Sequence, residues 1–221
     1  MSIKEIWLTS LSLYRKSLPQ IWRLGIVAGI TVTTSLFINA FYKTDGTTSK
    51  IISVVVPLTI SLSFVYLSSM ILLKIYNISN GQSISWKDTI SFINKRYIKV
   101  TVSMLIVFII NILGTIALLL PGIFAFVLFS MTQPLALLDN KGIMESVKGS
   151  YTLVWGKWWH TFAAIVPLIF INYWIDFSIS YATTHAQWYI VICSALIAML
   201  FYPLLYSCVL VIFKDLKSRM D

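Results

Sequence analysis

Long runs of apolar residues constrain this chain more than any other feature of its sequence. The 221 residues contain six such runs, at 21–42, 51–76, 98–120, 123–138, 162–182 and 188–213. A helix needs about 20 mostly apolar residues to cross the hydrocarbon core of a bilayer. Charged residues make up only 11% of the chain, against roughly 25% in soluble domains, so polar side chains cannot cover a water-soluble globule. The sequence therefore predicts an all-α fold, a polytopic membrane helical bundle with residues 1–221 as a single integral membrane domain.

The fourth run, 123–138, is the shortest of the six. Its 16 residues rise about 24 Å as a helix, which is less than the hydrocarbon thickness of about 30 Å. We expect this segment to lean on its neighbours or to sit where the bilayer is thinned. Pro121-Gly122 precedes it and predicts a hairpin between the third and fourth runs, because proline interrupts a helix and glycine permits a tight reversal.

The distribution of Lys and Arg predicts the orientation of the chain in the membrane. If six helices cross the bilayer, all of the 17 Lys and Arg residues except Lys43 and Lys50 lie on the side of the two termini. Such an excess is typical of the cytoplasmic side. Without the fourth run, the basic stretch 139–160 would fall on the opposite side. We therefore expect a multi-pass protein of the bacterial inner membrane with six transmembrane helices and both termini in the cytoplasm.

Three segments on the predicted cytoplasmic side have the spacing of amphipathic interfacial helices: 2–18, 85–97 and 140–158. Each places large apolar residues on one face and Lys or Arg on another. Signals for helix starts accompany them, namely Ser2 with Glu5, Ser85 with Asp88, and Asn140.

These segments and their borders supply the residues that we expect at the lipid interface. Their apolar faces would lie in the acyl boundary and their cations among anionic lipid headgroups of the phospholipid bilayer. The predicted set is Trp7, Tyr14, Arg15, Lys16, Trp86, Lys87, Lys95, Arg96, Tyr97, Tyr151, Trp155, Trp158 and Trp159. The same surface is also compatible with recruitment of a membrane-protein partner or with a homo-oligomer, whereas we expect no nucleic-acid partner.

Each amphipathic segment precedes two apolar runs, which divides the chain into three units, 1–76, 82–138 and 140–213. These units share one orientation, as parallel repeats about an axis along the membrane normal would. A common need for basic amphipathic helices at the interface explains the pattern equally well.

Small residues recur at helical spacing in the first run, as Gly25-x-x-x-Gly29. This pattern lets two helices approach closely. Packing within the chain and dimerisation both account for it.

Acidic residues are nearly absent from the apolar runs, and the exception, Asp176, supports an alternative function. Ionisable residues inside a membrane mark transport or proton pathways. The alternative is a small transporter or channel whose path runs near Asp176 through a polar cavity of Asn39, Asn111, Gln133, Asn172 and Asp176. In the simpler interpretation, Asp176 reaches the outer headgroup layer.

The sequence contains no constellation that would support an enzyme. Its two histidines lie at opposite membrane faces, and its two cysteines, Cys193 and Cys208, lie in one apolar run, so neither pair fits a zinc site or a Cys–His nucleophile. A Walker-type glycine-rich loop is also missing. We therefore expect no catalytic residue, no metal and no cofactor.

The stretch 118–158 resembles the YciC-type family of uncharacterised bacterial inner-membrane proteins. The matching features are Pro121-Gly122, the pattern from Pro134 to Asp139, and the amphipathic stretch from Ser146 to Trp155. The N-terminal segment around Tyr14-Arg15 looks like the same family. The resemblance extends more distantly to the membrane portion of some glycerophosphodiester phosphodiesterases. The resemblance implies an inner-membrane helical bundle without a settled molecular function. It slightly favours a function that involves lipids.

Taken together, these features favour a non-enzymatic membrane protein that acts through lipid contact or as a partner of an envelope complex. Reporter fusions test its predicted topology. A fusion within 139–160 should report a cytoplasmic position, and a fusion within 43–50 a periplasmic one, because the basic residues concentrate on the first side. A periplasmic signal from 139–160 would contradict the six-helix arrangement.

Overall fold

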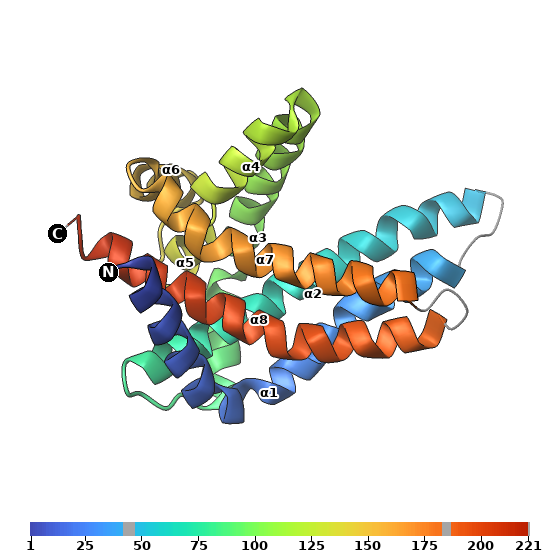
Figure 1. The fold of residues 1–221 in the computed structure, drawn as a ribbon, viewed down its shortest axis with the longest axis horizontal. Coiled ribbons are helices and arrows are strands. Elements are labelled where there is room, and N and C mark those ends of the chain that lie inside the picture. Colours follow the sequence, from blue (N-terminus) through green and yellow to red (C-terminus); the bar gives the residue numbers. More distant parts are fainter. Residues whose placement is uncertain (42–46, 183–186, 221) are drawn as a thin grey trace.

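A computed structural model gives the fold of the chain (Figure 1). It describes the backbone of residues 1–41, 47–182 and 187–220, and their side chains apart from 32–41, 47–54, 119, 176–182, 187–191, 194 and 195. These residues form eight helices and no strand: α1 (Ile3–Phe41), α2 (Thr47–Ser79), α3 (Trp86–Ala117), α4 (Leu119–Leu128), α5 (Thr132–Leu137), α6 (Ile143–Trp155), α7 (Trp158–Ala182) and α8 (Gln187–Lys217). The predicted all-α fold is confirmed.

Five segments of the described chain are long and apolar enough to cross a membrane: Val55–Ser79, Trp86–Ala117, Leu120–Leu137, Trp158–Ile175 and Leu196–Lys217. They overlap five of the six predicted runs. The remaining run, 21–42, belongs to α1, and from residue 32 it falls outside the residues whose side chains are described. The chain therefore has the helical, apolar character of a multi-pass membrane protein.

The helices α1, α2, α7 and α8 form a bundle that extends away from the end of the molecule where the termini lie (Figure 1). Within it, α8 packs against α1, α2 and α7. Buried aliphatic side chains, including Ile21, Leu72 and Leu210, fill its interior. The bundle is therefore the core on which the remaining helices are placed.

Gly25 allows α1 to approach α8 closely. A Cβ atom at this position would lie only 2.5 Å from the carbonyl oxygen of Met199. Because packed protein interiors leave no room for such an overlap, a larger residue would push the helices apart. At Gly25 the small-residue pattern therefore serves packing within the chain.

The first two predicted amphipathic segments are not separate helices. Residues 2–18 continue through Pro19 into the first apolar run, and 85–97 continue into the third run, as α1 and α3. Pro19 removes one backbone donor from α1, and the helix changes direction along its course (Figure 1). The third segment does form its own helix, α6, which Gly156 and Lys157 separate from α7.

The helices α3 and α4 form a hairpin that leans away from the bundle (Figure 1). The chain reverses at Leu118, whose extended backbone (φ −170°, ψ 151°) separates the two helices. The predicted hairpin is present, but Pro121 and Gly122 lie in the first turn of α4 rather than at the reversal. Gly122 has another use, because a Cβ atom there would lie 3.0 Å from the Cα atom of Thr115 on α3.

The fourth apolar run is broken into two helices, and α6 satisfies the backbone at the break. The break separates Leu128, the last residue of α4, from Thr132, the first residue of α5. The Ser150 hydroxyl of α6 donates to the carbonyl oxygen of Leu128 at 2.8 Å and accepts from the N–H of Met131 at 3.1 Å. All residues of α5 are buried. Irregular backbone is tolerated at membrane depth where protein surrounds it, so the short run leans on its neighbours as expected.

Two of the three predicted helix starts have the expected caps. The Ser2 N–H donates to a Glu5 carboxylate oxygen at 2.7 Å, and the Asp88 N–H donates to the Ser85 hydroxyl oxygen at 3.2 Å. The bond from the Ser2 backbone lowers the pKa of Glu5 below its ordinary value.

The prediction that Asn140 caps α6 is wrong. Asn140 has a left-handed backbone (φ 52°), and α6 begins after Gly142, whose N–H donates to a Glu145 carboxylate oxygen at 3.0 Å. The loop before α6 is instead fixed from α8, because Lys217 forms an ion pair with Asp139 at 2.8 Å.

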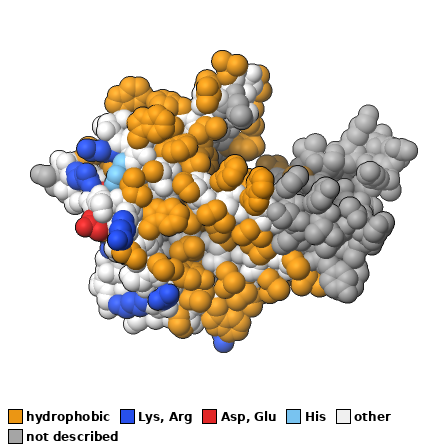
Figure 2. Space-filling view, in the orientation of Figure 1, with side chains coloured by type: hydrophobic (Ala, Val, Ile, Leu, Met, Phe, Trp, Pro, Cys, Tyr) orange, Lys and Arg blue, Asp and Glu red, His pale blue; other side chains and the backbone are white. Residues whose placement is uncertain are grey.

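Side-chain types are distributed unevenly over the surface. Lys and Arg side chains gather towards the end that holds the termini, and apolar side chains cover much of the rest of the visible face (Figure 2). Among the exposed apolar residues are Ile98, Phe108, Ile116 and Leu120 of the α3–α4 hairpin. Apolar surface of this extent is compatible with lipid contact and would be a liability in water.

We expect Ser150→Ala to lower the free energy of unfolding by about 1–3 kcal/mol, because the buried N–H of Met131 loses its partner. Thr152→Ala is the matched control, since Thr152 is exposed on the same helix and its hydroxyl donates to the Lys148 carbonyl oxygen of that helix. Thermal unfolding in detergent, followed by circular dichroism, compares the two variants. Equal destabilisation of both would contradict the role assigned to Ser150.

Candidate functional site

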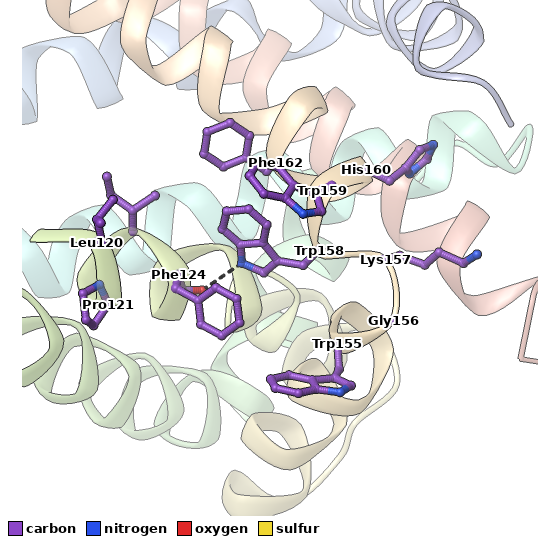
Figure 3. A pocket seen from close by; sticks show the side chains of 11 residues that line it. Leu120, Pro121, Phe124, Trp155, Gly156, Lys157, Trp158, Trp159, His160 and Phe162 are labelled. Carbon is purple, nitrogen blue, oxygen red and sulfur yellow. Dashed lines mark hydrogen bonds between the residues drawn. The ribbon is translucent and has the colours of Figure 1, made fainter.

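The helices α4, α6 and α7 line an open pocket that we call the aromatic groove (Figure 3). Its volume is about 900 Å³. The residues that line it are Leu120, Pro121, Ile123, Phe124, Trp155, Gly156, Lys157, Trp158, Trp159, His160 and Phe162. Most of these side chains are apolar, and five of them are Trp or Phe residues gathered around the junction of α6 and α7.

The local sequence explains why so many large side chains meet here. The helix α6 ends at Trp155, and α7 begins at Trp158 after a short turn in which the Lys157 N–H donates to the carbonyl oxygen of Val154 at 2.8 Å. This turn places consecutive bulky residues around Gly156. A Cβ atom at Gly156 would meet no atom within 4 Å, so the glycine leaves open space beside the rings.

Aromatic rings from all three helices form a continuous row. The centroid distances are 4.9 Å for Tyr151 and Trp155, 6.0 Å for Trp155 and Phe124, 5.1 Å for Phe124 and Trp158, and 5.0 Å for Trp158 and Phe162. Such pairs stabilise by about 0.5–1.5 kcal/mol beyond their burial. The Trp158 Nε1–H also donates to the Phe124 carbonyl oxygen at 3.1 Å, which joins α7 to α4 (Figure 3). The groove therefore has a wall of rings held in fixed positions.

Lys157 and His160 give the groove a polar end (Figure 3). Lys157 is exposed. The His160 Nε2 atom lies 3.1 Å from the carbonyl oxygen of Met1. The other ring nitrogen, Nδ1, is buried and has no hydrogen-bond partner. The groove thus combines an apolar interior with one exposed cation.

The structure brings together four of the residues predicted for the lipid interface. Tyr151, Trp155, Trp158 and Trp159 all belong to the α6–α7 junction, where Trp159 is 76% exposed. The sequence did not single out Phe124 and Phe162, which complete the row of rings.

The remaining predicted interface residues are distributed along α1 and α3. Arg15, Lys16, Lys87 and Lys95 are exposed, and Tyr14 and Trp7 are half-buried, with Trp7 packed against the core. The Trp86 ring lies under the ammonium group of Lys74, 4.1 Å from its centroid. The Tyr97 hydroxyl donates to the Leu62 carbonyl oxygen of α2 at 3.0 Å.

Arg96 has a position within the protein that sequence reasoning did not anticipate. Its guanidinium donates to the carbonyl oxygens of Leu137 and Leu138 at the end of α5, and it lies 4.0 Å from the Phe92 ring centroid. These carbonyls have no partner within α5 because the helix ends there. Arg96 therefore caps the second half of the broken run.

The residues predicted to form a polar cavity are not assembled among the described side chains. The Gln133 amide nitrogen donates to the hydroxyl oxygens of Ser68 and Ser69 at 2.7 and 3.3 Å. Asn111 lies on α3 and Asn172 on α7, and neither residue lines the aromatic groove. Asn39 and Asp176 lie outside the residues whose side chains are described.

Comparison with known proteins adds no relative: no protein-family model, curated protein or solved structure matches the chain. Among the described residues, no group of three or more His, Cys, Asp or Glu side chains is placed to hold a metal ion.

We expect Arg96→Gln to lower the free energy of unfolding by about 1–3 kcal/mol, because the carbonyl groups at the end of α5 lose a charged donor. The adjacent Lys95→Gln change should stay within about 0.5 kcal/mol, since Lys95 is exposed. Chemical denaturation in mixed micelles measures both. A loss that is the same for the two variants would contradict the capping role.

Proposed function

We propose that this chain is a six-helix, multi-pass protein of the bacterial inner membrane that binds phospholipid in the aromatic groove and has no catalytic activity. In this proposal both termini are cytoplasmic, and the segments 2–18, 85–97 and 140–158 lie at the cytoplasmic interface. Kinship with the YciC-type family belongs to the same proposal. The observation that carries it is the groove of about 900 Å³ with aromatic walls and a cation at one end.

The size and chemistry of the groove suit an acyl chain. Pockets for small ligands commonly measure about 300–1,000 Å³ and are mostly apolar with a few polar groups. An acyl chain gains little hydrophobic energy by leaving the bilayer, because lipid is already apolar. Selection must then come from packing against rigid rings and from the headgroup, to which a cation such as Lys157 contributes about 1 kcal/mol.

The transporter alternative rests on fewer observations. It requires the polar side chains near Asp176 to share one path, whereas Gln133 is bonded to α2 and Asn111 and Asn172 lie on α3 and α7. Those two helices are not among the pairs that pack extensively. Phospholipid binding is therefore the function that we favour. A membrane-protein partner and a second copy of the chain are the alternative occupants of the aromatic groove.

Gly156 offers a direct test, because it lines the groove and a side chain there would meet no clash at its Cβ atom. Its backbone (φ −74°, ψ −4°) accepts any L-residue, and its Cβ position is open. We expect Gly156→Leu to reduce the phospholipid that is retained through purification in mild detergent about tenfold, which corresponds to about 1.4 kcal/mol. Native mass spectrometry counts the bound lipids.

Gly156→Ala is the control, since a methyl group leaves most of the groove open. It should retain phospholipid as the wild type does. Equal retention by all three proteins, with unchanged melting temperatures, would refute lipid binding in the groove.

A further inference from the structure

Lys74 of α2 is a buried cation with no acidic partner among the residues that the structure describes. Its residue is only 6% exposed, and its ammonium group donates to the Ile84 carbonyl oxygen at 3.0 Å and lies 4.1 Å from the Trp86 ring centroid. Neither contact supplies a negative charge. The ion pairs among the described residues are Met1–Asp215, Lys217–Asp139 and Arg219–Asp215, none of which involves Lys74. Buried charges are normally paired, so this environment favours an anionic partner for Lys74.

A cavity of about 330 Å³ lies beside this ammonium group. We call it the Lys74 pocket, and its lining comes from α1, α2, the loop that follows α2, and the start of α3. Besides Lys74, it is lined by a second cation, Arg23, and by the indole rings of Trp22 and Trp86. The Arg23 guanidinium lies 5.5 Å from the Trp22 ring centroid and is exposed. None of the described residues that line the pocket is acidic.

We propose that the Lys74 pocket binds a phosphate group. An arginine presents paired donors that match phosphate oxygens, and a lysine adds a compact charge. Tryptophan walls are typical of the depth at which phospholipid headgroups lie. Lys74 is close to the end of α2 at Ser79, which places the pocket near the end of the helix. The group can come from a lipid headgroup or from a soluble phosphate compound, and the two sources share this chemistry.

The Lys74 pocket is separate from the aromatic groove. The two cavities have no lining residue in common. A structural role for Lys74 is the competing explanation, because its bond to Ile84 anchors the loop between α2 and α3. Such a role would affect unfolding without changing the affinity for phosphate, so the two explanations differ in a measurable way.

The experiment titrates a short-chain phosphatidylglycerol, detected by native mass spectrometry, in the wild type and in a Gly156→Leu background that blocks the groove. We expect Lys74→Met and Arg23→Gln each to weaken binding about tenfold. Diacylglycerol with the same chains, which lacks the phosphate, should be insensitive to both changes. Lys4→Gln is the matched control, since Lys4 is an exposed cation of α1 that does not line the pocket.

Inorganic phosphate added as a competitor identifies the source. Displacement of phosphatidylglycerol indicates a pocket for soluble phosphate compounds, and failure to displace it indicates a lipid headgroup. Unchanged phosphatidylglycerol binding in both variants would overturn the proposal, as would an equal loss of diacylglycerol binding. If Lys74→Met does not fold, Arg23→Gln still tests the proposal, because Arg23 is exposed and its replacement should leave the fold intact. Normal lipid retention by Gly156→Leu alone would count against the groove and not against this pocket.

Discussion

Backbone hydrogen bonding at the break between α4 and α5 is the constraint on which the surrounding arrangement depends. These peptide groups are buried, so a neighbouring side chain must bond them. Ser150 does so with two bonds, which hold α6 against both short helices. Because α6 ends shortly afterwards at Trp155, its position also sets the start of α7, and Trp158 comes to lie on Phe124. The bonds between Ser150 and the break therefore help to position the residues that line the aromatic groove.

Basic residues of this chain have two different uses. Arg96 and Lys217 bond groups of the protein itself, at the end of α5 and at Asp139. Lys157 and Arg23 remain exposed beside cavities. The positive-inside rule counts all of these charges alike, because it concerns the cost of moving a charge across the membrane. Which cations are left for a ligand depends on the three-dimensional fold.

The helical fold class and most apolar segments were predictable, because hydropathy depends on composition alone. Local signals were predictable where they act within one turn, as at Ser2 and Ser85. The reversal at Leu118 was missed because proline is also tolerated in the first turn of a helix, where Pro121 lies. Phe124 was missed because nothing distinguishes it from other apolar residues of its run until α7 packs nearby. Arg96 was read as a headgroup ligand because its partners, Leu137 and Leu138, are distant in sequence.

The two cavities occur at corresponding places in the predicted units. One lies where α1 passes Pro19 and reaches Trp22 and Arg23, and the other lies where α6 gives way to α7 around Lys157. Pro19 lies within α1 and removes one backbone donor there, whereas a Gly-containing turn separates α6 from α7; each place is next to Trp and a cation. In the second unit, 82–138, α3 passes the same point without interruption. Both proposed binding sites therefore lie beside a proline or a Gly-containing turn where an interfacial segment meets an apolar run.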